Sequence, residues 1–205
     1  MINLPSDLNN SLINMEDSIR SSYEIPNKRF TIDYKFEGLK LTPIALRIFS
    51  LLSEKYRTLI AFSDTGSAAL AKRDYPDLKD KIFTFKSFTD SEFIKDDNTS
   101  LISINTQPFD FEDFEPMCEE FLGNHFVINP KFEDINVGIG SVIRERRNNF
   151  VKTWKNLYYL QPLNKGALMH SYPNNWQLFK EVNSKYLFVK EFNEKPDNEA
   201  IFINL

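Results

Sequence analysis

The chain has 205 residues, of which 41% are apolar and 26% charged, so it can bury a hydrophobic core of its own. Its formal net charge of −4 gives no bulk attraction to nucleic acid or to anionic lipid. The single cysteine, Cys118, excludes an internal disulfide and a multi-cysteine zinc site, and its helical surroundings favour a buried small hydrophobe. We therefore expect a globular protein without a nucleic-acid partner, a cofactor or a metal.

The N-terminal stretch MINLPSDLNNSLINMEDSIR is polar and acidic. It lacks the basic region and the apolar stretch of a secretory signal, and it does not have the composition of a transit peptide. No apolar run approaches the ~18 residues that a membrane-spanning helix needs. These features predict a cytoplasmic protein that is at most peripheral to a membrane.

Hydrophobic periodicity predicts alternating helices and strands along the first three quarters of the chain. The stretch 29–36 alternates Phe30 and Ile32 with polar residues, and its polar face suggests an exposed or edge strand. The expected helices cover 6–25, a segment from Thr42 to about residue 52, 67–73, 111–122 and 142–154. The expected strands cover 29–36, 58–62, 81–88, 100–105 and 125–129.

From Asn156 the pattern changes to short alternating runs separated by turns. The runs are NLYYLQPL, GALMHSYP, WQLFKEV and KYLFVKEF, and the clearest turn between them is Asn183-Ser184-Lys185. Such a meander of hairpins is antiparallel. The tail 193–205 is first charged and then apolar, and we expect it to pack back loosely.

This order of elements predicts an α/β fold, a three-layer Rossmann-like, mostly parallel sheet flanked by helices with a C-terminal antiparallel hairpin extension. No linker, repeat or low-complexity block interrupts the chain. We expect one domain over 1–205, with a βα-alternating part at 1–155 and the antiparallel meander and tail at 156–205. By analogy with doubly wound folds, the first five strands are expected in the order 3-2-1-4-5.

The first candidate site follows the strand 58–62, in the sequence RTLIAFSDTGSAALAKRDYPD. Asp64, Thr65, Gly66 and Ser67 form a tight turn into a helix, where amides can bind phosphate or another anion. A structural turn capped by Asp64 or Ser67 is favoured over this, since Asp64 repels phosphate. An aspartic-protease loop is disfavoured, because its chemistry needs two carboxylates and this motif occurs once and leads into a helix.

The second candidate site is the sequence VGIGS between the strand 125–129 and the next helix. Gly138 and Gly140 allow a ligand close to the backbone, Ser141 follows them, and Arg146 and Arg147 are placed to clamp an anion. A structural loop remains the favoured alternative, because a Gly-x-Gly pair alone is weak evidence for a dinucleotide site. Both turns would lie at the same carboxyl edge of a parallel sheet, and this convergence is the main functional indication.

Other chemically suggestive residues have plain structural explanations. The charged run with Arg144, Glu145, Arg146, Arg147 and Lys152 is typical of a solvated helix face. His125 and His170 are more typical of strand or turn positions than of ligands, and spacing alone assembles no catalytic nucleophile, base and orienting group. The aromatic residues Tyr159, Tyr172 and Trp176 form either a packing layer or a patch for a protein partner.

Three stretches, 62–77, 128–150 and 157–179, resemble a domain family of unknown function from cyanobacteria and chloroplasts. Its plant members include the low photosystem II accumulation proteins, which are assembly factors. The resemblance covers nearly the whole chain and brings no active site with it. The positions that resemble the family are Asp64, Gly66, Lys72, Arg73, Asp74, Asn129, Pro130, Gly138, Gly140, Arg146, Tyr159, Pro162, Gly166, Pro173 and Trp176.

Two functional hypotheses follow. The resemblance implies a non-catalytic accessory or assembly factor that acts through protein contacts in photosystem II or thylakoid biogenesis, in the cytoplasm or at the thylakoid surface. The two glycine turns support the alternative, a phosphate- or nucleotide-binding Rossmann-like domain, either a binding module or an enzyme, with a small anionic ligand at the carboxyl edge of the sheet. We favour the first.

Overall fold

The computed structural model describes residues 4–104, 106–132 and 141–205, with the backbone only at 141 and 142. The helices are α1 (Leu8–Ser21), α2 (Leu41–Leu52), α3 (Thr65–Asp74), α4 (Phe85–Thr89), α5 (Phe111–Glu120), α6 (Ser141–Lys152) and α7 (Asn198–Asn204). The strands are β1 (Arg29–Tyr34), β2 (Arg57–Phe62), β3 (Ile82–Thr84), β4 (Thr99–Ile104), β5 (Asn124–Ile128), β6 (Lys155–Leu163), β7 (Gly166–Ser171), β8 (Trp176–Val182) and β9 (Lys185–Phe192). Short 3₁₀ helices cover Pro76–Lys81, Glu92–Lys95 and Pro108–Asp110.

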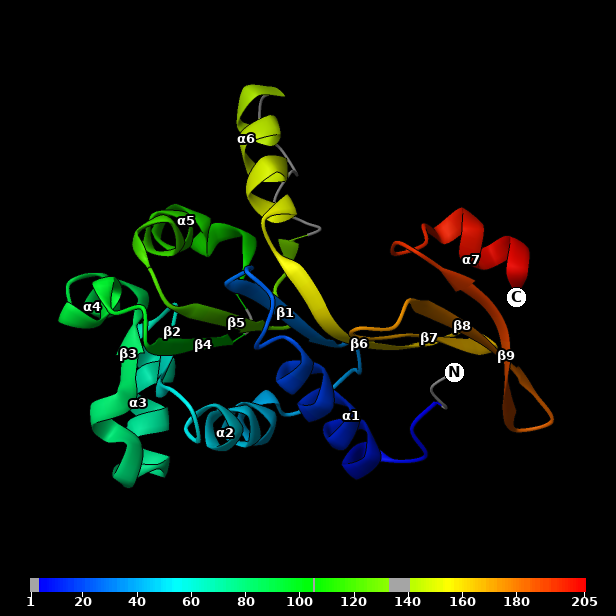
Figure 1. Cartoon of the computed structure of the whole chain (residues 1–205), viewed down its shortest axis with the longest axis horizontal. Coiled ribbons are helices and arrows are strands. Elements are labelled where there is room, and N and C mark those ends of the chain that lie inside the picture. Colours follow the sequence, from blue (N-terminus) through cyan, green and yellow to red (C-terminus); the bar gives the residue numbers. More distant parts are fainter. Residues whose placement is uncertain (1–3, 105, 133–140) are drawn as a thin grey trace. The chain divides into compact units, whose positions relative to one another are not determined.

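The strands form one sheet in the order β3-β2-β4-β5-β1-β6-β7-β8-β9 (Figure 1). Strand β2 runs parallel to β3 and β4, and β4 runs parallel to β5. From β6 to β9 each strand is antiparallel to the next. The predicted α/β fold with an antiparallel C-terminal extension is therefore confirmed.

The predicted order of the first five strands is wrong, because β1 lies between β5 and β6. The predicted edge position of β1 is wrong for the same reason, and residues 30–34 are all buried. Its polar side chains are buried because they have partners. Asp33 accepts a hydrogen bond from Asn156 Nδ2 at 2.9 Å and pairs with Lys35 Nζ at 3.0 Å. Paired in this way, polar residues are tolerated inside a protein.

The chain forms two compact units. The terminal unit comprises Met1–Pro26, Ile32–Leu39 and Asn156–Leu205, and the central unit comprises Asn27–Thr31 and Lys40–Lys155. The change of sequence pattern at Asn156 coincides with one border between them. The single domain over 1–205 stays a prediction.

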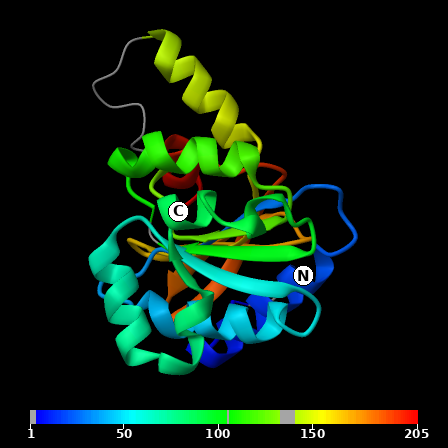
Figure 2. The same cartoon turned by 90° about the vertical axis from the view of Figure 1, so that its left-hand side faces the viewer.

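In the central unit the parallel strands lie between two layers of helices. Figure 2 shows α2 and α3 on one face of the strands and α4 and α5 on the other. Alternation along β2 accounts for this, since Leu59 and Ala61 join the core beneath α4 and α5 while the buried Ile60 points the opposite way. At Gly123, a Cβ would collide with the carbonyl oxygen of Thr99, so only glycine allows this close approach.

The expected strand 81–88 is only three residues long and continues as α4. The Thr84 hydroxyl accepts a hydrogen bond from the backbone N–H of Ser87 at 3.1 Å, and Ser87 Oγ accepts one from the Thr84 N–H at 2.8 Å. This reciprocal capping starts a helix within a sequence whose apolar alternation resembles a strand.

In the terminal unit the antiparallel strands lie between α1 and α7 (Figure 1). On the α1 side, the rings of Tyr34 and Tyr158 pack against each other at an interplanar angle of 39°, with centroids 5.2 Å apart. On the α7 side, Ile201 packs on a cluster of buried residues that includes Leu168. The predicted hairpin turn is confirmed: Asn183 and Ser184 both have positive φ, 50° and 60°, as a type I′ turn requires.

Candidate functional site

The turn after β2 is closed by its own carboxylate. Asp64 is the N-cap of α3, and its Oδ1 accepts a hydrogen bond from the backbone N–H of Ser67 at 2.7 Å. This hydrogen bond is the main reason why the pKa of Asp64 is lowered, so the group stays ionised at neutral pH. Thr65 and Gly66 form the first turn of the helix. The structure therefore places a negative charge on the amides that the anion hypothesis assigned to phosphate.

The second predicted turn can be placed only in part. Gly138 and Gly140 lie outside the described residues, and Ser141 is the first residue of α6. Strands β2 and β5 both run parallel to β4, so their carboxyl ends lie at one edge of the sheet. That the two glycine turns meet at this edge stays a prediction.

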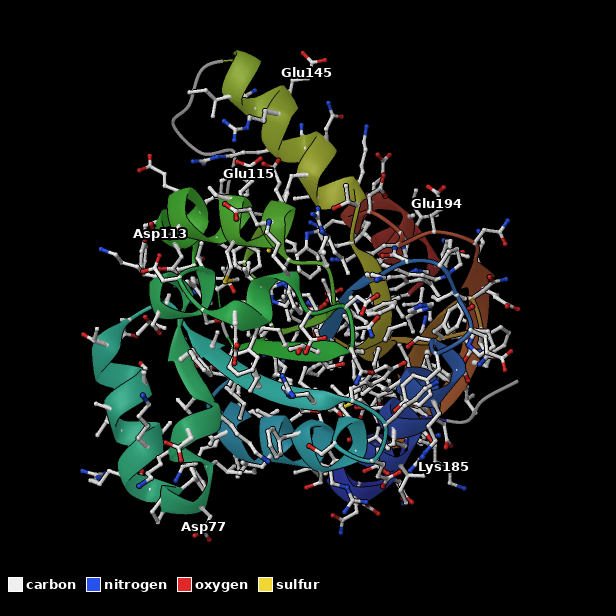
Figure 3. The ribbon with its side chains drawn as sticks, turned by 60° about the vertical axis from the view of Figure 1, so that its left-hand side comes forward. Asp77, Asp113, Glu115, Glu145, Lys185 and Glu194 are labelled. Atoms are coloured by element: carbon white, nitrogen blue, oxygen red, sulfur yellow. The ribbon has the colours of Figure 1, made fainter. Side chains whose placement is uncertain are left out.

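The two arginines proposed as an anion clamp bind the protein itself. Arg146 contacts Glu115 of α5 in a bidentate manner, with Nη2 at 2.9 Å from Oε2 and Nε at 3.2 Å from Oε1. The Glu115 side chain is only 6% exposed, and Figure 3 shows it between α5 and α6. The guanidinium of Arg147 lies over the ring of Phe111, 4.6 Å from its centroid. Both arginines thus attach α6 to α5.

Beside this contact the central unit has a wide, charged hollow of about 520 Å³. Arg29 lines it and donates hydrogen bonds to the carbonyl oxygen of Cys118 at 2.6 Å and to Thr153 Oγ1 at 3.0 Å. Both arginines of the lining are therefore engaged by the protein. The lining residues are Arg29, Glu115, Glu119, Glu145, Arg146, Asn149, Phe150 and Thr153.

The sequence did not predict a buried row of three side chains, in which a thiol contacts an imidazole and the imidazole contacts a hydroxyl. Cys118 Sγ lies 3.4 Å from His125 Nδ1, and His125 Nε2 lies 2.8 Å from Ser103 Oγ. In type and order these groups match a nucleophile, a base and an orienting residue. No sequence signal indicates this row of side chains, because its three residues lie on α5, β5 and β4 and meet only in the folded protein.

Burial makes these three side chains poorly suited to nucleophilic catalysis. All three side chains are buried. Burial raises the pKa of the Cys118 thiol well above its usual value and lowers the pKa of His125 to about 3. Both groups are therefore neutral at physiological pH, whereas a nucleophilic cysteine needs a thiolate and access to its substrate.

The predicted aromatic patch is mostly a packing layer. Tyr159 and Trp176 are buried, with ring centroids 5.0 Å apart, and only Tyr172 is partly exposed. Trp176 also stacks on His170 at 4.8 Å, and Tyr159 Oη donates a hydrogen bond to Gln161 Oε1 at 2.7 Å. This is the structural alternative that the sequence left open.

Two further site types are not found within 4–104, 106–132 and 141–205. Among these residues, no three or more histidine, cysteine or acidic side chains are arranged to hold a metal ion. Nor does any of their helices combine the length and the apolar character needed to cross a membrane.

The fold and these sites define a mixed α/β protein. Most of the polar side chains considered above as ligand-binding groups are already engaged by other groups of the protein itself. The chain belongs to the family described as domain of unknown function (DUF1995), which matches residues 5–202. No curated protein matches the chain significantly.

Proposed function

We propose that the protein is a non-catalytic accessory factor that acts through protein contacts, in assembly of photosystem II or in thylakoid biogenesis. The family resemblance of the sequence suggests the process. The proposal includes a cytoplasmic location with at most peripheral association with the thylakoid membrane. The observation that carries the protein-contact mechanism is the exposed β8–β9 hairpin of the terminal unit.

The hairpin exposes apolar side chains near its turn. Val182, Tyr186, Leu187 and Val189 are all more than one third exposed. Charged residues are their neighbours in the sequence, namely Glu181, Lys185 and Lys190. Exposed apolar and aromatic side chains on an edge hairpin are enriched in protein-binding surfaces.

Strand β9 also presents an unpaired backbone edge. It ends the order of strands, so among the described residues no strand lies on its outer side. A bulge interrupts it, because Leu178 pairs with Lys190 while Phe179 pairs with Phe188, which leaves Val189 as the extra residue. A bulged edge with lysines resists indiscriminate association but still offers a short segment to a specific partner.

The alternative, phosphate or nucleotide binding at the carboxyl edge, has less support. Asp64 already accepts the hydrogen bond of the Ser67 amide, and Arg146 is paired with Glu115. A phosphate would have to displace one carboxylate from the amides and compete with another for the guanidinium.

A complementation experiment with two matched leucines tests the proposal. Leu187 on the hairpin is 53% exposed and Leu70 on α3 is 52% exposed, so Leu187→Glu and Leu70→Glu make the same change in equally exposed positions. Each gene is introduced into a photosynthetic host that lacks its own family member, and photosystem II content is measured. We expect Leu70→Glu to restore the content to the level of the unaltered chain, and Leu187→Glu to fail.

Circular dichroism first verifies that both variants are folded. Full rescue by Leu187→Glu would refute the hairpin as the contact surface. Normal photosystem II content in the deletion host would refute the assembly function itself.

A further inference from the structure

The terminal unit contains a pocket of about 490 Å³, within the range of ~300–1,000 Å³ that is usual for small-molecule sites. Its walls come from the first turn of α1 and the residues before it, from the turn after β1, and from β6. The residues that line it are Pro5, Ser6, Asp7, Leu8, Ser11, Phe36, Glu37, Gly38, Leu39 and Leu160.

The walls of the pocket are largely apolar. Leu8 and Phe36 are 49% and 41% exposed although both line the same hollow, while Leu160 is buried at 6% exposure. Gly38 has a φ of 71°, a left-handed conformation that turns the chain between Phe36 and Leu39. The pocket thus offers apolar surface that the described residues 4–104, 106–132 and 141–205 leave in water, and an apolar ligand would cover it.

The charges of the pocket are negative. Asp7 and Glu37 are the charged residues of its lining, which contains no lysine or arginine among the residues that the structure describes. The Asp7 carboxylate is fixed, because Oδ1 accepts the Asn10 N–H at 2.9 Å and Oδ2 accepts the Ser6 hydroxyl at 3.0 Å. The hydrogen bond from the Asn10 amide is the main cause of its lowered pKa, so the charge persists at neutral pH.

Asp7 also prevents the first turn of α1 from acting as an anion site. It is the N-cap of this helix and already occupies the Asn10 amide that an anion would need. A ligand with a negative head would therefore meet two carboxylates and a capped helix end, whereas a positive head would be attracted.

We propose that this pocket binds a small molecule with an apolar body and a positively charged head. The body lies against Phe36, Leu8 and Leu160, and the head lies towards Asp7 and Glu37. This inference is independent of the hairpin and of the assembly function, since it rests on a different surface of the terminal unit.

Three probes with the same decyl chain separate the two parts of this recognition. Decyltrimethylammonium, decyl glucoside and decyl sulfate are titrated below their micellar concentrations into the full chain, by calorimetry and by amide NMR. We expect saturable binding of one decyltrimethylammonium, with shifts of the Ser11 and Leu39 signals. The sulfate should bind roughly 2–30-fold more weakly, because the two exposed carboxylates that attract the cationic head repel the sulfate head.

Two variants and their matched controls assign the contacts. Phe36→Ala should weaken all three probes about tenfold, since it removes one large apolar contact. The control Phe202→Ala removes an 84% exposed phenylalanine of α7, which is not part of the lining, and should change nothing. Glu37→Gln should reduce the preference for the cation over the sulfate about threefold, while Glu199→Gln on α7 should leave it unchanged.

Equal affinities for the cationic and anionic probes would overturn the charge assignment. Equal effects of Phe36→Ala and Phe202→Ala would overturn the location. If Phe36→Ala does not fold, the NMR shifts of the unaltered chain decide, and a cation that leaves the Ser11 and Leu39 signals unmoved refutes the site.

Discussion

Mild acid should destabilise this protein through one buried imidazole. The pKa of His125 is about 3 in the folded chain, because burial disfavours the charged ring, whereas an unfolded histidine has a pKa of ~6.5. As the pH falls below ~6.5, His125 therefore binds a proton in the unfolded state but not in the folded state. The free energy of unfolding decreases as a result. The loss is about 1 kcal/mol by pH 5.8 and would reach roughly 4–5 kcal/mol near pH 3.

Urea unfolding at pH 8.0 and pH 5.8 measures this loss while keeping the pH above the sequence pI of about 5.3. His125→Gln removes the titrating group but keeps polar atoms for Ser103 and Cys118, so its stability should change about 1 kcal/mol less between the two pH values. The NMR signal of the His125 ring gives an independent readout in the unaltered chain. A titration midpoint above ~5, or equal pH dependence in both proteins, would refute the assignment of a buried neutral imidazole.

Two further substitution experiments test individual hydrogen bonds. Tyr34 Oη donates to the carbonyl oxygen of Ser11 at 3.2 Å, while the buried Tyr158 Oη has no partner of acceptable geometry among the described residues. Tyr34→Phe should therefore lower the free energy of unfolding by about 1 kcal/mol, whereas Tyr158→Phe should lower it much less, and an equal loss in both urea titrations would contradict this. Asp64→Ala should cost about 1 kcal/mol through loss of the α3 cap and Asp64→Asn much less, which thermal unfolding can compare; equal stability of the two would argue against capping.

The fold was largely predictable because local patterns determine it. Alternation of periods near two and near four residues gave the α/β class, and the Asn183-Ser184 turn gave the last hairpin. The position of β1 was not predictable, since Asp33 looks solvent-facing until Asn156, more than a hundred residues away, becomes its partner. Pairings of that range leave no periodic trace in the chain.

The candidate site was less predictable for the same reason. The sequence correctly suggested that Asp64 can cap a helix, because capping is local. It gave no reason to pair Arg146 with Glu115, or to align Cys118, His125 and Ser103. Residue types indicate which chemistry is available, but burial and long-range partners decide whether it is used.

The polar groups considered above at the carboxyl edge of the sheet already have partners within the protein, whereas apolar side chains of the terminal unit are exposed. A binding surface is therefore better sought in the terminal unit. In parallel α/β sheets the carboxyl edge is the usual ligand site, and here it lies in the central unit, where Asp64 caps the turn after β2. The exposed apolar surfaces argued above, the β8–β9 hairpin and the pocket beside Phe36, both belong to the terminal unit. An antiparallel extension with exposed apolar residues costs solubility, so a binding role accounts for it better than a structural one. On the function proposed above, the central unit is the scaffold, and we expect substitutions there to act through stability rather than through recognition.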